Sequence, residues 1–128
     1  MKFLLDTHTL IWAVYNQESL SSHVRQILEL PDHEMIVSAA SAWEIATKYR
    51  LGKLPSARVL AEDFISILTQ SGYSLIPITP EHALRAGRLP GSHKDPFDRM
   101  LAAQAIHEDL TLLSNDASLD LFGIRREW

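Results

Sequence analysis

The chain has 128 residues, a formal net charge of −4 and no cysteine. This length is near the commonest size of one domain, and it allows a buried core without disulfides. Zero cysteines exclude thiolate catalysis and cysteine-ligated metal sites, which leaves carboxylates and histidines as metal ligands. No apolar run approaches the length of about 18 residues that a membrane span needs, and Asp6 interrupts the first one too early for a signal peptide. We therefore expect one soluble, cytoplasmic domain over residues 1–128.

Short apolar runs alternate with longer helical patterns along the chain. Runs of strand length lie at residues 2–6, 35–39, 75–78 and 111–114, and residues 124–128 can add a last edge strand. Apolar residues recur at helical spacing over residues 19–30 and 57–70. Such alternation is typical of a parallel sheet with helices on both faces. We therefore predict an α/β fold with a central parallel sheet of four to five strands.

The helix with the clearest start is predicted over residues 95–108. Asp95 fits the N-cap position, because its carboxylate can accept hydrogen bonds from the first free N–H groups. Pro96 fits the first helical position, where the missing N–H has no cost. Several alanines in the middle of this helix would let it lie close to the sheet.

Acidic residues are predicted to meet at one edge of the sheet. Asp6 ends the first strand, Asp116 follows the 111–114 strand, and Glu44 and Asp98 lie early in two helices. Ligands of open α/β sheets bind outside the carboxyl ends of the strands. Several carboxylates at one point repel one another unless cations neutralise them. We therefore predict a site for Mg²⁺, which prefers oxygen ligands and acidifies the water that it binds.

Each acid also has a structural explanation. Glu44 completes a capping-box pattern with Ser41, Asp98 suits the positive end of the helix macrodipole, and Asp116 suits a turn or a cap. Asp6 lacks such an explanation, because an acid at the end of a buried strand is unfavourable without a partner. The purely structural interpretation needs four coincidences at one sheet edge, so we favour the metal site.

Four segments resemble the signature stretches of the PIN-domain nucleases, and specifically of the VapC-type toxins of type II toxin–antitoxin modules. They are LLDTHTLIW, SAASAWEIATK, HKDPFDRMLAAQA and TLLSNDASL, in the family's order. The resemblance implies a Rossmann-like PIN fold, RNA cleavage that depends on Mg²⁺ or Mn²⁺, and inhibition by a cognate antitoxin protein. It also implies that Asp6, Glu44, Asp98 and Asp116 are the metal-binding and catalytic residues. The family often has threonine at the position of Ser114, which keeps a hydroxyl group.

Hydroxyl and basic residues near the acids are candidates for contact with RNA. The substrate-binding candidates are Thr7, Ser114, Arg99 and Lys48. Lys94, Arg50 and Lys53 can steer phosphate too, although such residues equally form ordinary solvated helix faces. The formal charge does not exclude RNA, because the 16 acidic residues less the four at the site equal the 12 basic ones. We expect His8 and His93 at the surface.

Aromatic residues near the predicted site suggest a place for a partner. Trp12, Trp43 and Phe64 are expected in the core or at a partner interface rather than as platforms for base stacking. Candidates for a groove that receives the antitoxin are Trp12, Trp43, Ile45 and Tyr49. We also expect a homodimer.

Two other protein classes fit this sequence less well than a nuclease does. A phosphotransferase or phosphatase of the haloacid-dehalogenase type would carry Asp-x-Asp after its first strand, where this chain has His8 in the second acidic place. A receiver domain would need a lysine after a late strand, and none follows TLLS. A catalytically inactive PIN-fold binding module stays open, and a metal-binding titration would distinguish it from an enzyme.

Overall fold

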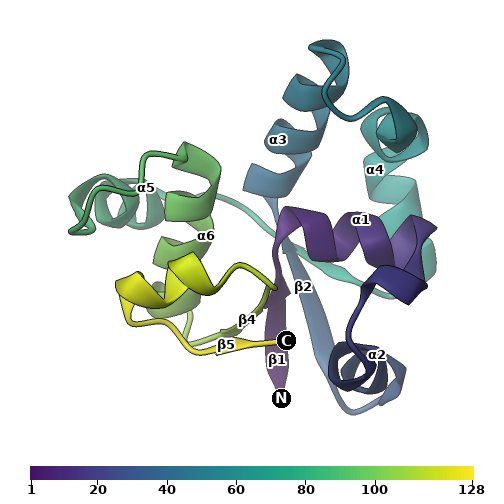
Figure 1. The fold of residues 1–128 in the computed structure, drawn as a ribbon, viewed down its shortest axis with the longest axis horizontal. Helices are drawn as coiled ribbons and strands as arrows, with labels where there is room; N and C mark the ends of the chain where they lie inside the picture. The colour runs from purple at the N-terminus through teal and green to yellow at the C-terminus, as the bar shows by residue number, and fades with distance from the viewer.

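Five parallel strands form one sheet in the order β3-β2-β1-β4-β5 in the computed structural model, which describes residues 1–128 (Figure 1). They are β1 (Lys2–Leu5), β2 (Glu34–Ser38), β3 (Ser74–Ile76), β4 (Thr111–Leu113) and β5 (Arg126–Glu127). The four predicted strands and the last edge strand are confirmed. β3 ends earlier than predicted, directly before Pro77, because proline has no N–H to donate to the ladder.

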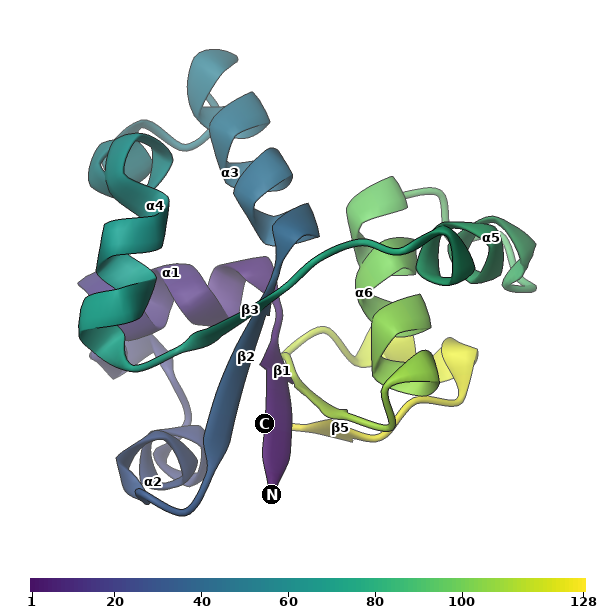
Figure 2. The ribbon, with the colours of Figure 1, turned by 180° about the vertical axis from the view of Figure 1, so that it is seen from behind.

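Helices cover both faces of this sheet, as predicted. They are α1 (Thr7–Tyr15), α2 (Ser22–Glu29), α3 (Ala39–Arg50), α4 (Arg58–Ser71), α5 (Pro80–Arg88) and α6 (Pro96–His107), with the short 3-10 helices η1 (Gln17–Ser19), η2 (Pro55–Ala57) and η3 (Ala117–Phe122). Figure 1 and the reverse view in Figure 2 place α1, α2 and α4 on one side of the sheet and α5, α6 and η3 on the other. None of these helices is both long and apolar enough to cross a membrane.

The predicted helices are confirmed with adjusted ends. α6 matches the helix predicted over residues 95–108, and the Asp95 carboxylate caps it by accepting the N–H of Phe97 at 2.9 Å. α4 matches the pattern over residues 57–70. α2 is shorter than the pattern over residues 19–30, because Ser21 caps it by accepting the N–H of Val24 at 3.0 Å.

Two helices were not predicted. α1 follows β1 with only Asp6 between them, and most of its residues are buried, so it lacks the polar stripe that marks an amphipathic helix. α5 begins at Pro80 with Thr79 in a capping box, which are helix-start signals that the sequence does contain. The first omission matters for function, because α1 carries several residues of the site.

Two hydrophobic cores lie on opposite faces of the sheet. Successive residues of a strand point to opposite faces, so Phe3 and Leu5 pack with α1, α2 and α4 while Leu4 packs with α6 and η3. All three side chains of β1 are at most 2% exposed. This double burial explains why the strands are continuous apolar runs rather than alternating ones.

The strand order reverses between β1 and β4. From β1 the sheet grows through β2 to β3, and the chain then returns to add β4 and β5 on the other side. At such a switch point the loops after the two central strands diverge and leave a crevice. Asp6 follows β1 directly, and Asp116 follows β4 after two residues. The topology therefore brings these two acids to the same crevice.

We predict that Leu4→Ala lowers the free energy of unfolding by about 3 kcal/mol, because it leaves a cavity that the neighbouring side chains fill only in part. Leu4 is fully buried, whereas Leu84 on α5 is 55% exposed. Leu84→Ala should therefore change the stability by less than about 0.5 kcal/mol. Urea denaturation followed by circular dichroism measures both values. Equal losses in the two variants would contradict a close-packed core at Leu4.

Candidate active site

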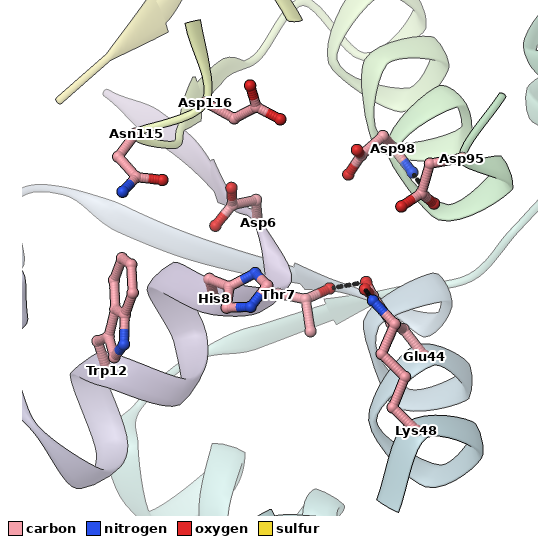
Figure 3. Close-up of a pocket in the computed structure, with 10 residues that line it drawn as sticks. All are labelled: Asp6, Thr7, His8, Trp12, Glu44, Lys48, Asp95, Asp98, Asn115 and Asp116. Carbon is pink, nitrogen blue, oxygen red and sulfur yellow. Dashed lines mark hydrogen bonds and ion pairs between the residues drawn. The ribbon is translucent and has the colours of Figure 1, made fainter. Parts of the chain in front are cut away.

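A pocket opens at the carboxyl end of the sheet, where α1, α3, α6 and the loop after β4 meet (Figure 3). The residues that line it are Asp6, Thr7, His8, Trp12, Glu44, Lys48, Asp95, Asp98, Asn115 and Asp116. All four acids predicted for the site are among them, together with Asp95. Segments more than 100 residues apart in the sequence therefore contribute carboxylates to one cavity.

Asp6 joins β1 to α1. Its backbone N–H donates to the carbonyl of Leu113 at 3.1 Å, and its carboxylate accepts the N–H of Thr9 at 2.8 Å as the N-cap of α1. The expectation that Asp6 has no structural role is therefore wrong, because the helix that it caps was not predicted. Burial raises the pKa of Asp6, although hydrogen bonds from Ser114 and Thr9 lower it in part.

Glu44 lies in the second turn of α3 and is 3% exposed. The capping box proposed for Ser41 and Glu44 does not form, because α3 starts earlier and Ser38 is its N-cap. Instead, Glu44 Oε1 accepts a hydrogen bond from Thr7 Oγ1 at 2.5 Å, and Oε2 pairs with the ammonium of Lys48. Donors thus hold both oxygens of Glu44, which fixes the carboxylate at the pocket wall.

Asp98 lies in the first turn of α6, three residues after the cap. Its Oδ2 is 3.0 Å from Nε2 of His93. Burial raises the pKa of Asp98 to about 6, against a hydrogen bond from His93 that lowers it. Repulsion from Asp95 and Glu44 raises this pKa further. The surface position expected for His93 is wrong, because its side chain is only 17% exposed and its ring packs edge-on against Phe122.

Asp116 is the N-cap of η3, so its proposed turn or cap role is confirmed. Its Oδ1 accepts hydrogen bonds from the N–H and the hydroxyl of Ser118, at 3.0 and 2.6 Å. Ser114 is fully buried behind the loop, where its Oγ accepts the N–H of Asp116 at 3.0 Å. Ser114 therefore supports both Asp6 and Asp116 from behind the pocket rather than lining it.

Lys48 is the basic candidate that lines the pocket. The guanidinium of Arg99 instead donates to the carbonyls of Ala86 and His93 at 3.0 Å each, and to that of Leu89. Arg99 is therefore a clamp on the loop between α5 and α6; these bonds use three of its five N–H donors, and its side chain does not line the pocket. The other basic candidates, Lys94, Arg50 and Lys53, do not line the pocket either.

Trp12 and Asn115 also line the pocket. Trp12 packs against the core, as expected, and it also reaches the pocket because it lies four residues after His8 on the same face of α1. Asn115 is not among the predicted site residues, although its position next to Asp116 is a signal in the sequence. Phe64 does pack against the core, as expected.

The pocket suits a hard divalent cation. Five carboxylates, one lysine and one histidine line it, so most of the potential ligand atoms are oxygens, which Mg²⁺ and Mn²⁺ prefer. Burial raises the pKa values of Asp6 and Asp98, which reflects the cost of removing these charges from water, and repulsion from Asp95 and Glu44 adds to this cost for Asp98. The residues present therefore fit such an ion both by donor type and by charge.

A second cluster of possible metal ligands lies where the start of α5 meets the end of α6. Ligand atoms of His82, His107 and Glu108 lie within 4.8 Å of one another. Nδ1 of His82 accepts the N–H of Thr79 at 3.0 Å, and its Nε2 lies 3.1 Å from Glu108. A neutral imidazole has only one accepting nitrogen, so Nε2 carries the proton and donates it to Glu108. The cluster therefore fastens α5 to α6 and leaves no nitrogen of His82 for a metal.

We predict that Asp98→Asn stabilises the metal-free protein at neutral pH. A rise in pKa from 3.8 to about 6 corresponds to a cost of about 3 kcal/mol for the ionised group, reduced by its partial exposure. The folded state binds the proton of the Asp98 carboxyl group more tightly than the unfolded state does. The free energy of unfolding therefore falls as pH rises from 3.8 to about 6, and it stays low at higher pH. Asparagine removes the charge and can still accept from His93.

Calorimetry in excess chelator should therefore show a melting temperature several degrees higher for Asp98→Asn at neutral pH. The gain should disappear below the ordinary carboxyl pKa of 3.8. Asp32→Asn, at an exposed turn, is the control and should change little. A lower melting temperature for Asp98→Asn would show that Asp98 stabilises the fold of the metal-free protein rather than destabilising it.

Comparison with known proteins extends these observations. The family model of the PIN domain matches residues 3–123, which include all four acids. Ribonuclease VapC22 of Mycobacterium tuberculosis is 33% identical over 119 residues, which cover 91% of this chain and 88% of that protein. Ribonuclease VapC16 of the same organism is 39% identical over 67 residues, and this shorter match covers 52% of the chain but only 46% of VapC16.

Solved structures share the fold at low sequence identity. The structure of VapBC2 from Rickettsia felis bound to a DNA fragment from its promoter matches with a TM-score of 0.72 and 17% identity, over 99% of this chain and 98% of that one. VapBC-1 from nontypeable Haemophilus influenzae matches with a TM-score of 0.68 and 18% identity, over 99% and 97% of the two chains. Family model, relatives and fold agree, and the chain belongs to the PIN-domain family.

Proposed function

We propose that this chain is a metal-dependent endoribonuclease and the toxin of a type II toxin–antitoxin module. The observation that carries the proposal is the convergence of Asp6, Glu44, Asp98 and Asp116 on one pocket at the switch point of the sheet. Asp6 and Asp116 also accept hydrogen bonds at helix starts, and Asp98 is paired with His93. These local roles do not require four acidic side chains to face one cavity. The names of VapC16 and VapC22, both ribonucleases, support the same activity.

In this proposal the four acids hold Mg²⁺ or Mn²⁺, which offsets phosphate charge and makes water a better nucleophile. The protein contributes fixed positions for the acids. Thr7 orients Glu44 through its hydroxyl, and Ser114 supports Asp6 and Asp116. Because these contacts exist before substrate arrives, little reorganisation is needed at the moment of reaction.

Lys48 is the side chain best placed to contact an RNA phosphate. Although burial lowers the pKa of Lys48, the hydrogen bond and the charge of Glu44 raise it above 10.5. The side chain is therefore a cation at neutral pH, and it lies at the wall of an otherwise acidic pocket. Thr7 positions Glu44, and Ser114 positions Asp6 and Asp116, so we no longer propose that these two residues bind substrate. The same holds for Arg99, which fastens the loop between α5 and α6.

We predict that the purified protein cleaves RNA with Mg²⁺ or Mn²⁺ and not in excess chelator. Asp6→Asn, Glu44→Gln and Asp98→Asn should each lower the rate by about 100-fold or more, since losing even an outer-shell partner costs about 10- to 100-fold. Gel assays with labelled RNA measure the rates, and calorimetric titration with Mn²⁺ measures metal binding.

Asp95→Asn is the matched control, because asparagine is an equally good cap and Asp95 already serves that role. It should keep most of the activity. Loss of metal binding in this variant alone would show that Asp95 rather than Asp98 is the ligand. Undiminished cleavage in chelator would contradict metal dependence, and metal binding without any cleavage would favour an inactive PIN-fold binding module. The PIN-domain match leaves the phosphotransferase and receiver-domain hypotheses without support.

We further propose that a cognate antitoxin inhibits the enzyme. The structural neighbours from Rickettsia felis and Haemophilus influenzae are VapBC proteins. An acidic pocket suits a basic side chain of a partner, and Trp43 offers an apolar anchor nearby. Trp43 is 59% exposed, and its ring packs edge-on against Phe97, which adjoins Asp98. Ile45 is fully buried, so it fills the core and is removed from the candidate groove.

Expression of the chain alone should arrest growth, and co-expression with the small open reading frame next to its gene should restore it. Trp43→Glu should still arrest growth but be rescued less, because an exposed anchor contributes to binding rather than to folding. Culture density over time measures both effects. Equal arrest with and without the neighbouring frame, or no arrest in either, would contradict the toxin–antitoxin assignment. The expected homodimer and cytoplasmic location stay predictions.

A further inference from the structure

We propose that Trp12 and Asn115 form a subsite for one unpaired nucleobase of the RNA, next to the acids that in the proposed function hold a metal ion against its phosphate. This inference rests on the proposed ribonuclease function and adds two residues that select the substrate. Both side chains line the same pocket as the acids. Figure 3 shows them on one side of Asp6, with Asp95, Asp98 and Glu44 on the other.

The indole of Trp12 lies against two other aromatic rings. Its ring centroid lies 5.8 Å from that of Trp128, and 5.8 Å from that of His8 on the preceding turn of α1. The side chain is partly buried against the core and still reaches the pocket. An aromatic ring fixed in this way loses little freedom when a base stacks on it, and such stacking contributes about 1–3 kcal/mol per base.

Asn115 supplies polar groups at the same wall. Its side chain is exposed, and its amide takes part in none of the hydrogen bonds of the structure, whereas its neighbours are held by the turn. The N–H of Asp116 donates to Ser114 Oγ at 3.0 Å, and Asp116 accepts from Ser118. A rigid turn therefore presents an amide whose donor and acceptor can pair with the edge of a base.

The chemistry of the pocket walls selects this side for the base. A phosphate at the acids carries a nucleoside on each side, and each base needs either a flat apolar surface or solvent. The wall formed by Asp95, Asp98, Glu44 and Lys48 is charged, and the only rings among the lining residues are those of His8 and Trp12. One base therefore lies on the Trp12 wall, and it must be unpaired, because a base inside a duplex has both faces stacked on its neighbours and its Watson–Crick edge paired.

A double-mutant cycle, in which protein variants are assayed on intact and on abasic RNA, tests the subsite. The substrate is a short single-stranded RNA that the wild-type protein cleaves with Mn²⁺, together with a series of the same RNA in which one nucleotide at a time is abasic. Trp12→Leu should lower kcat/KM about tenfold or more on the intact RNA, and it should have little effect on the RNA that is abasic at the stacked position. Trp12→Phe should restore most of the loss.

Asn115→Ala should change the order in which the four bases are preferred at that same position, while activity on the abasic RNA is unchanged. Because Trp12 also packs against the core, melting temperatures accompany every measurement. If Trp12→Leu does not fold, Trp12→Phe and the exposed Asn115→Ala carry the cycle. If each protein variant lowers kcat/KM by the same factor on intact RNA and on every abasic RNA, the protein and RNA changes act independently. This result would overturn the subsite and leave the nuclease proposal intact.

If the wild-type protein cleaves no RNA, the proposed function fails, and fluorescence anisotropy then decides the subsite separately. The probe is the same intact or abasic RNA with a fluorescein label. The subsite requires that Trp12→Leu weaken binding of the intact RNA about tenfold and leave binding of the abasic RNA unchanged. Equal affinities of both proteins for intact RNA would overturn it.

Discussion

The burial of carboxylates at the carboxyl end of the sheet is the constraint on which the arrangement of the site depends. Burial raises the pKa values of Asp6 and Asp98, so the fold holds these charges at a cost. Each acid is kept in place by a local donor, which is a helix N–H for Asp6 and His93 for Asp98. Capping and metal binding are therefore compatible, because a carboxylate fixed through one oxygen still directs the other to the pocket.

The two cores make this arrangement rigid. Alternate residues of β1 are buried on opposite faces, so the backbone just before Asp6 cannot shift without disturbing both cores. The clamp from Arg99 to three carbonyls holds the loop that carries His93, and through it the surroundings of Asp98. A residue that does not line the pocket thus supports the site through the loop that it fastens.

The pocket has two walls of different chemistry, as the proposed selection among RNA sequences requires. Acids and Lys48 form one wall, which suits a cation and, in the proposed function, the phosphate common to every nucleotide. Trp12 and Asn115 form the other, where we propose that aromatic and amide groups distinguish one base from another. Trp43 lies beyond this pocket, against Phe97, so the proposed contact with a partner and the proposed contact with a base use different aromatic residues.

The sequence by itself determined the fold class, the strands and the four acids, because continuous apolar runs and acids at their ends are local patterns. It did not reveal α1, whose buried residues leave no polar stripe, and so it did not reveal that Asp6 caps this helix or that α1 brings Trp12 and His8 to the same pocket. Only the tertiary structure decided the role of Arg99, because its acceptors lie on a loop whose path no local pattern encodes. The tertiary structure likewise decided which oxygen of Glu44 contacts Thr7 and which contacts Lys48. The contact with Thr7 joins two helices that are far apart along the chain, and the contact with Lys48 depends on where α3 begins.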